Sequence, residues 1–288
     1  VEVSSVTIKE LLSAGVHFGH QTRRWNPRME DFIFESRNRI HIIDVRKTQR
    51  LLDEALEFIR DTVASGRDVI FVGTKKQCRE VLKETAENLE MHYVIDRWLG
   101  GTLTNFKTIR SSIKRLIELE EIRESESLEG RSKKEEASLR REEYKLHRNL
   151  DGIRNMVRPP GAMIIVDTIR EHNAIREGIK LGIPIVALID TNCDPSEIDY
   201  PIPCNDDGIR SVKLLIRAIA EAVAQGEALR KAGGKKEEKS PDGSPAEKSP
   251  ESAPASKKKT PAKKKKAEAE SEIKEAEEAP PVEPESVK

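Results

Sequence analysis

The chain has 288 residues, of which 51 are basic and 51 are acidic, so its formal net charge is zero. This balance excludes a protein whose overall electrostatic field attracts nucleic acid. A nucleic-acid-binding site on this chain must therefore arise from local segregation of charge. No apolar run reaches the roughly 20 residues that cross a bilayer. Three widely spaced cysteines, an odd number, favour reduced thiols. We expect an intracellular protein without a membrane segment.

Short runs rich in Val and Ile alternate with amphipathic helical patterns along the first 230 or so residues. The predicted strands are 40–44, 69–72, 93–95, 163–167 and 185–189. The predicted helices are 48–63, about 75–89, about 173–181 and about 209–224. Near-continuous aliphatic strands linked by helices are typical of a parallel sheet that is buried on both faces. The pattern predicts an α/β fold, a doubly wound parallel sheet of about five strands.

One long segment, 106–154, interrupts this alternation and contains no strand pattern. Both of its halves carry apolar residues at helical spacing, and the stretch 125–132 between them is polar and turn-like. We predict an inserted antiparallel helical hairpin of coiled-coil type. Two roles remain open for it, a packed structural arm and an arm that binds a partner.

The C-terminal part, from about residue 229 to 288, is rich in Lys, Glu, Ala and Pro and lacks aromatic residues. Such a segment buries too little apolar surface to offset its chain entropy, so we predict a disordered tail after an α/β domain that spans 1–228. Its lysine runs either add non-specific RNA affinity or are cancelled by neighbouring acids.

Two windows lack acidic residues, one between Glu10 and Glu30 and the other at 97–117. Each combines Arg or Lys with Asn, Thr and Gly, and each holds one of the two tryptophans, Trp25 and Trp98. Cations suit phosphates, indoles suit stacking on bases, and glycines allow close backbone approach. The windows predict RNA binding, although a tryptophan in a polar loop also serves to anchor one element to another.

The turn Gly73–Gln77 follows a predicted strand and opens a helix, where free amides and two lysines attract phosphate. It matches neither the G-x-G-x-x-G nor the G-x-x-x-x-G-K-[ST] pattern, so a bound nucleotide cofactor is the weakest interpretation. An RNA phosphate contact and an ordinary strand-to-helix turn are the other two.

The spacing His17-x-x-His20 admits a metal ion, with Cys193 and Cys204 as further ligands, but the surrounding arginines oppose a cation. We therefore predict that no metal ion binds here. Instead, we expect His17 and His20 to position Trp25 or to contact RNA. Asp190 and Asp194 follow a predicted strand, where they either form a turn or serve as acid, base or magnesium ligands.

The rival interpretation is an α/β enzyme that handles a phosphorylated metabolite, with phosphate at Gly73–Lys76 and chemistry at Asp190 or Asp194. No catalytic set can be assembled from the residues around these positions. A third interpretation is a free adaptor protein that docks through the helical hairpin.

Five segments in order along the chain resemble the bacterial small-ribosomal-subunit proteins of the "S-two" family. They are AGVHFGHQTRRWNPRM (14–29), FVGTKKQ (71–77), RWLGGTLTNFKTI (97–109), LGIPIVALIDTNCDP (181–195) and DYPIPCNDDGIRSVKLL (199–215). The resemblance covers about residues 4–228. Two departures are Cys204, where a glycine is expected, and Pro159-Pro160-Gly161 in place of the usual Pro-Asp.

The resemblance implies a flavodoxin-like domain with the hairpin insertion, and a structural constituent of the small subunit of the cytoplasmic ribosome that acts in translation. It implies contacts with small-subunit rRNA where head meets body, contacts with other small-subunit proteins, and recruitment of the large mRNA-catching protein. It implies no enzyme activity, cofactor, small-molecule substrate or membrane contact. The residues that we expect nearest RNA are Arg23, Arg24, Trp25, Asn26, Arg28, Lys75, Lys76, Arg97 and Lys107. Those that we expect to contact RNA or anchor a loop are His17, His20, Trp98, Gly100, Gly101 and Asn105.

Overall fold

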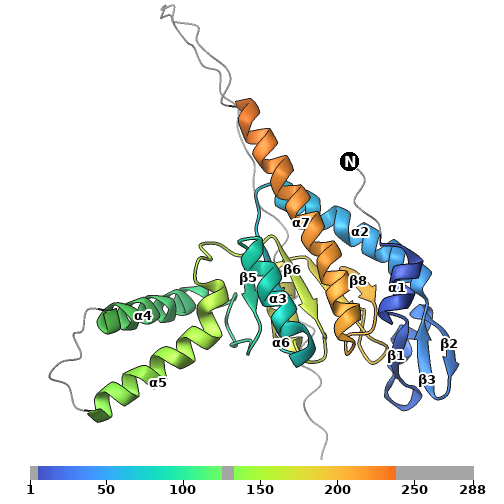
Figure 1. The fold of residues 1–288 in the computed structure, drawn as a ribbon, viewed down its shortest axis with the longest axis horizontal. Coiled ribbons are helices and arrows are strands. Elements are labelled where there is room, and N and C mark those ends of the chain that lie inside the picture. The colour runs from blue at the N-terminus through green and yellow to red at the C-terminus, as the bar shows by residue number, and fades with distance from the viewer. Residues whose placement is uncertain (1–5, 125–132, 238–288) are drawn as a thin grey trace, which may run out of the picture. The chain divides into compact units, whose positions relative to one another are not determined.

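The computed structural model describes residues 6–124 and 133–237 (Figure 1). The expected hairpin turn at 125–132 lies outside the described residues, as does the chain from 238 to 288. The last helix, α7 (Ile209–Glu237), continues past the boundary expected at 228. Within the described ranges no helix is both long and apolar enough to cross a membrane.

The main sheet has five parallel strands in the order β5-β4-β6-β7-β8, which is the strand order of flavodoxin-like folds. The strands are β5 (His92–Val94), β4 (Val69–Val72), β6 (Ala162–Val166), β7 (Ile185–Ile189) and β8 (Tyr200–Pro203). Every residue of β4, β6 and β7 is buried, as expected for a sheet covered on both faces.

Two apolar clusters cover the two faces of this sheet, because successive side chains of a strand point to opposite sides. Phe71 and Ile164 point to one cluster, which includes residues of α2 (Val45–Ala64), α3 (Lys76–Asn88) and α7. Ile70 and Ile165 point to the other, which includes residues of α6 (His172–Leu181) and the hairpin. The doubly wound architecture is confirmed.

One of the five strands expected in the main sheet is not part of it, and another strand takes the place at the edge. Residues 40–43 form β3 (Ile40–Ile43), which is the central strand of a separate antiparallel sheet with β1 (Phe18–Gln21) and β2 (Ile33–Arg37). The burial of β3 alternates, as suits a sheet with one covered face. The fifth parallel strand is β8 instead, which the sequence pattern missed because Pro201 and Pro203 are tolerated only on an edge strand.

A short helix, α1 (Ile8–Ala14), precedes the antiparallel sheet and was also not expected. A capping box starts it, in which Thr7 accepts from the Glu10 amide and Glu10 accepts from the Thr7 amide. The antiparallel sheet then packs on the carboxyl end of β7. A Cβ added at Gly19 would lie 2.6 Å from Thr191 Cγ2, so only glycine permits this approach.

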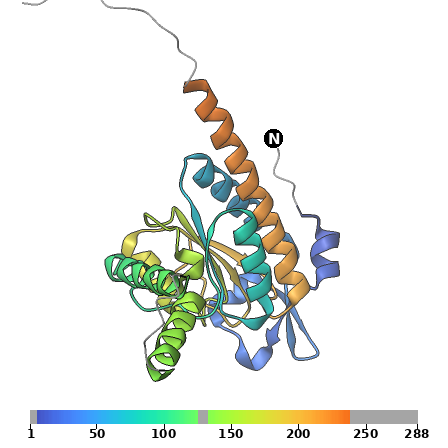
Figure 2. The ribbon, with the colours of Figure 1, turned by 60° about the vertical axis from the view of Figure 1, so that its left-hand side comes forward.

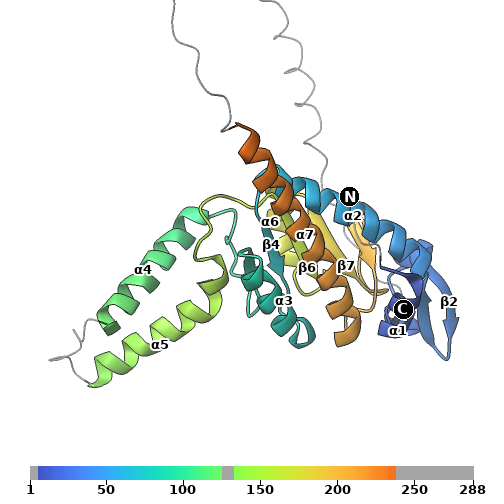
Figure 3. The ribbon, with the colours of Figure 1, turned by 45° about the horizontal axis from the view of Figure 1, so that its top comes forward.

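The predicted helical hairpin is formed by α4 (Phe106–Glu124) and α5 (Lys133–Leu150), followed by the short helix η3 (Asp151–Ile153). Figure 2 shows both helices projecting from the α/β domain, and Figure 3 shows the hairpin and the antiparallel sheet at opposite ends of the described domain. Ile109, Ile113 and Leu150 at its base join the apolar cluster beneath the sheet, which anchors the arm.

Helices α2 and α7 pack against each other at Gly226, and this contact gives the first prediction (Figure 1). A Cβ added at Gly226 would lie 2.6 Å from the backbone oxygen of Arg60, which a rotamer change cannot relieve. Although alanine is the better helix former, we expect Gly226→Ala to lower the free energy of unfolding by about 1–2 kcal/mol in urea titrations. Gly100→Ala is the matched control: no atom lies within 4 Å of its added Cβ. Equal stability of the two variants would contradict the packing argument.

Candidate nucleic-acid interface

The first acid-poor window forms a loop that is fastened to the end of β7. It contains the short helices η1 (Thr22–Arg24) and η2 (Pro27–Phe32). The backbone amide of Asn26 donates to the carbonyl of Thr191 at 2.8 Å, and the side chain of Asn26 accepts from the Arg28 amide at 3.0 Å. These bonds hold the loop in one conformation on the sheet edge.

The side chains of this loop divide into exposed cations and packed groups. Arg23 and Arg24 are exposed, and neither forms an ion pair with another described residue. Trp25 is half-buried, with its ring centroid 5.3 Å from that of His41. Arg28 is exposed but is engaged by Asp194 and by Ser196 Oγ at 3.1 Å. Arg23 and Arg24 are therefore the loop's free cations.

The second window is organised by one buried carboxylate, that of Glu177 in α6. Its Oε1 accepts from Trp98 Nε1 at 3.0 Å and from the Gly101 amide at 2.7 Å. Its Oε2 accepts from the amides of Leu103 and Thr104, each at 2.9 Å, and from Thr104 Oγ1 at 3.0 Å. Burial opposes the charge, but these hydrogen bonds hold the pKa of Glu177 below its ordinary value.

This arrangement decides which residues of the second window can meet a ligand. Trp98 is buried and serves as an anchor, so its ring is not available for base stacking. Gly101 has a φ of 89°, which favours glycine, and its amide is used by Glu177. Arg97, Gly100 and Lys107 are exposed. Asn105 is also exposed, and its side chain accepts from Thr108 Oγ1 at 2.9 Å.

The turn after β4 is likewise satisfied from within the protein. The amide of Thr74 donates to Glu171 Oε1 at 2.9 Å, and Arg170 Nε donates to Thr74 Oγ1 at 2.7 Å. A Cβ at Gly73 would lie 2.5 Å from Leu82 Cδ1. A carboxylate therefore occupies the position that a phosphate would take at this helix start, and the geometry is that of a structural turn.

Lys75 points into the protein and not toward solvent. Its Nζ lies 2.7 Å from Asp206, 2.7 Å from Asp207 and 3.3 Å from Asp167, and its side chain is only 13% exposed. Burial opposes the charge, but Asp206 and the other aspartates raise the pKa of Lys75. We therefore drop Lys75 from the expected phosphate contacts and keep Lys76, which is exposed at the start of α3.

His20 closes the same cluster of carboxylates from the side of the antiparallel sheet. Its Nδ1 lies 3.0 Å from Asp190 Oδ2 and its Nε2 lies 3.4 Å from Asp207 Oδ2. The interaction with Asp190 outweighs burial and raises the pKa of His20. A cavity of about 290 Å³ opens beside it, lined by His20, Arg24, Asp190 and Asp207 among others.

Two sets of ligand atoms in this cluster lie close enough together to hold a small cation. One set is His20, Asp206 and Asp207, and the other is Asp167, Cys193 and Asp206. The ammonium of Lys75 contacts carboxylates of both sets, so it already supplies the positive charge that a metal ion would bring. His17 belongs to neither set, and its ring centroid lies 4.1 Å from that of Phe18, with the two rings tilted by 40°.

The cysteines are not activated as nucleophiles, and the aspartates that the rival enzyme interpretation requires are engaged elsewhere. Burial raises the pKa of the Cys78 thiol to about 12 and that of Cys193 to about 11, so both remain protonated near neutral pH. Cys204, which replaces an expected glycine, is fully buried in the core. Asp190 accepts from the Thr191 amide, and Asp194 pairs with Arg28.

Two buried glutamates that organise these loops, Glu171 and Glu177, were not among the residues predicted from the sequence. Both are buried at α6, the predicted helix near 173–181. A signal was present, because Glu177 stands between the apolar Ala174 and Ile175 and the small Gly178, on the face that packs on the sheet. A charged residue on a buried helix face requires partners, and here the loop amides supply them.

Comparison with known proteins agrees with this geometry. The family model described as Ribosomal protein S2 matches residues 11–226. The chain belongs to the ribosomal protein S2 family. Its members are structural components of the small ribosomal subunit and not enzymes, which removes the enzyme interpretation.

Several relatives named "Small ribosomal subunit protein uS2" match over most of their length. The chain is 56% identical to that of Thermobifida fusca over 235 residues, which is 81% of this chain and 80% of the relative. It is 57% identical to that of Acidothermus cellulolyticus, over 79% of this chain and 83% of the relative. It is 54% identical to that of Mycobacterium ulcerans, over 80% of this chain and 83% of the relative.

The role of Glu177 gives the second prediction. Glu177→Ala leaves the buried donors of Trp98 and Leu103 and the part-buried donors of Gly101 and Thr104 without their acceptor, and we expect a loss of about 3 kcal/mol of stability in urea titrations. Faster hydrogen exchange at the Leu103 and Thr104 amides should accompany it. The exposed Glu80→Ala is the control and should change stability by less than about 0.5 kcal/mol.

The same carboxylate gives the stability a defined pH dependence. Because the folded-state pKa of Glu177 is lowered, its contribution is fully present above the ordinary value of 4.5 and is lost as the pH falls through the folded-state pKa. The difference in stability between the parent chain and Glu177→Ala should therefore shrink in acid. A difference that stays constant down to pH 3 would contradict this account.

The third prediction concerns the titration of His20. Since Asp190 raises its pKa above 6.5, stability from this pair is present below pH 6.5 and is lost as the pH rises through the folded-state pKa. In a histidine NMR titration, His20 should titrate above 6.5, and Asp190→Asn should shift it downward. His17 and His41, whose pKa values burial lowers, are internal controls. A His20 value unaffected by Asp190→Asn would refute the assignment.

Proposed function

We propose that this chain binds small-subunit rRNA as a structural constituent of the cytoplasmic ribosome and supports assembly of the subunit. The observation that carries this proposal is a set of exposed cations, on loops and at helix starts, that form no ion pair with another described residue. These cations are Arg23, Arg24, Lys76, Arg97 and Lys107. Ammonium and guanidinium groups on preorganised loops suit phosphates, which position a protein on RNA with little readout of base identity.

We further propose that the chain contacts other small-subunit proteins and takes part in recruiting the large mRNA-binding ribosomal protein. Exposed apolar side chains on the strands of the antiparallel sheet support a protein contact. Phe34 is 71% exposed, Phe18 is 48% exposed and Ile40 is 37% exposed, and all three belong to β1, β2 or β3. Exposed aromatic side chains of this kind are typical of protein interfaces.

The fourth prediction tests the RNA contact directly. The charge reversals Arg23→Glu and Arg24→Glu together should reduce incorporation of the chain into small subunits at least about tenfold, because attraction to phosphate becomes repulsion. Occupancy is measured in purified particles by quantitative mass spectrometry, at several salt concentrations.

The matched control reverses two exposed arginines on other elements, Arg50 in α2 and Arg217 in α7, whose side chains are 71% and 78% exposed. This control removes the same total charge and should leave incorporation nearly unchanged. If both double variants occupy particles as the parent chain does, the loop at 22–28 does not bind rRNA.

A further inference from the structure

Helix α5 of the hairpin has a basic face that points away from α4 and is not evident from the composition of the segment. In α5, Lys134, Arg141, Lys145 and Arg148 follow one another at intervals of seven, four and three residues, which places them on one side of the helix. All four are exposed. Tyr144 lies beside them and is 70% exposed, although a tyrosine ring is costly to leave in water.

Three glutamates of α5 pair with arginines of the hairpin, and two of them, Glu136 and Glu143, lie on the opposite side of the helix from the basic face. Glu142 accepts from Arg115 Nε at 3.1 Å, and Glu143 accepts from Arg123 Nη1 at 2.6 Å. Glu136 pairs with Arg140 at 2.5 Å. Arg141 and Lys145, by contrast, form no ion pair with any described residue. The pairing leaves these two charges free for an external anion.

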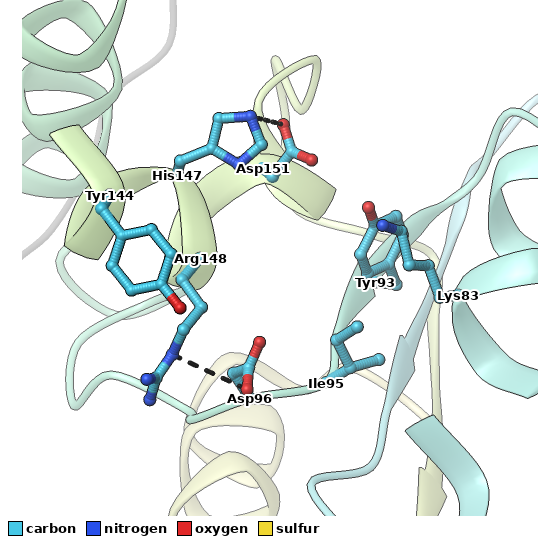
Figure 4. A pocket seen from close by; sticks show the side chains of 8 residues that line it. All are labelled: Lys83, Tyr93, Ile95, Asp96, Tyr144, His147, Arg148 and Asp151. Carbon is cyan, nitrogen blue, oxygen red and sulfur yellow. Dashed lines mark ion pairs between the residues drawn. The ribbon is translucent and has the colours of Figure 1, made fainter. Parts of the chain in front are cut away.

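A cavity of about 200 Å³ lies at the foot of this face, between α5 and the α/β domain. Figure 4 shows Tyr144, His147 and Arg148 on one side of it and Lys83, Tyr93 and Ile95 on the other. Its surface thus combines aromatic rings, an aliphatic side chain and cations. These are the groups that hold an unpaired nucleotide, by stacking on the base and by attraction to its phosphate.

Two carboxylates line the cavity, and one of them, Asp96, is neutralised by two arginines. Asp96 lies 3.0 Å from Arg79 Nη1 and 3.7 Å from Arg148 Nε, and Asp151 lies 3.8 Å from His147 Nε2. Their remaining oxygen lone pairs can accept hydrogen bonds from the N–H groups at a base edge. The cavity therefore offers acceptors to a base as well as cations to a phosphate.

We propose that the outward face of α5 and the cavity at its foot form a second RNA-binding surface. Lys134, Arg141 and Lys145 pair with phosphates along one strand, and the cavity takes an unpaired base against Tyr144. The face from Lys134 to Arg148 runs for about 21 Å along the helix axis, so it follows several nucleotides. This inference rests on the proposed rRNA binding and assigns the hairpin a ligand of its own.

The test measures binding of the purified full chain to full-length small-subunit rRNA over a range of salt concentrations. Tyr144→Ala should weaken binding about 5- to 100-fold, whereas Tyr144→Phe, which keeps the ring, should bind nearly as the parent chain does. Arg141→Ala with Lys145→Ala should reduce the slope of log affinity against log salt by about 1.4–1.8, since two phosphate contacts are lost. Arg50→Ala with Arg217→Ala is the control for charge.

The outcomes separate this inference from the proposed function. If the Arg23 and Arg24 reversals weaken binding but the Tyr144 and Arg141/Lys145 variants keep the affinity and salt slope of the parent chain, the second surface is refuted alone. If the parent chain does not bind the rRNA, both proposals fall. If the α5 variants lose particle occupancy but keep their rRNA affinity, the face binds a protein, and the inference is wrong. Thermal melts confirm folding of each variant.

Discussion

Buried carboxylates that bind the chain's own donors are the constraint on which the rest of this structure depends. Glu177 gathers the loop at 98–104, Glu171 holds the turn after β4, and Asp206 with its neighbours holds Lys75. A buried carboxylate is costly unless its oxygens are hydrogen-bonded, so each of these groups imposes one conformation on the segment around it. The negative charges of these carboxylates therefore lie inside the protein and not on its surface. Next to these segments, Lys76 and Arg97 are exposed and form no ion pair with another described residue, although the whole chain is electrically neutral.

The antiparallel sheet explains why a fold that often carries enzymes serves a structural family here. In doubly wound proteins the carboxyl ends of the parallel strands form the usual ligand site. In this chain β1 lies over that edge, with Gly19 against Thr191 and His20 beside Asp190. Lys75 fills the space among the aspartates that a substrate or a metal ion would otherwise use. What remains accessible are the loops at the rim and the arm formed by the hairpin.

The hairpin shows how ion pairing can leave a basic surface on a segment whose acids and bases are nearly balanced. Its acids and bases occur in short blocks along the sequence, and the apolar positions fix which side of each helix packs. Arginines of the hairpin pair with Glu136, Glu142 and Glu143, whereas Arg141 and Lys145 form no ion pair with a described residue. The composition of the segment reveals neither the pairing nor the resulting face, because both depend on which residues the two helices bring opposite each other.

Periodicity and residue type alone determined the doubly wound architecture, the position of the hairpin and the location of the two acid-poor windows. These are local properties, since a buried parallel strand must be aliphatic and an amphipathic helix must repeat its apolar residues. Only the tertiary structure decided that residues 40–43 leave the main sheet, that β8 replaces them, and that Trp98 and Lys75 turn inward. Each of these outcomes depends on a partner distant in sequence, such as Glu177 for Trp98 or Asp206 for Lys75. A local pattern cannot specify such a partner, because hydrogen bonds and burial are settled between segments that meet only in the folded chain.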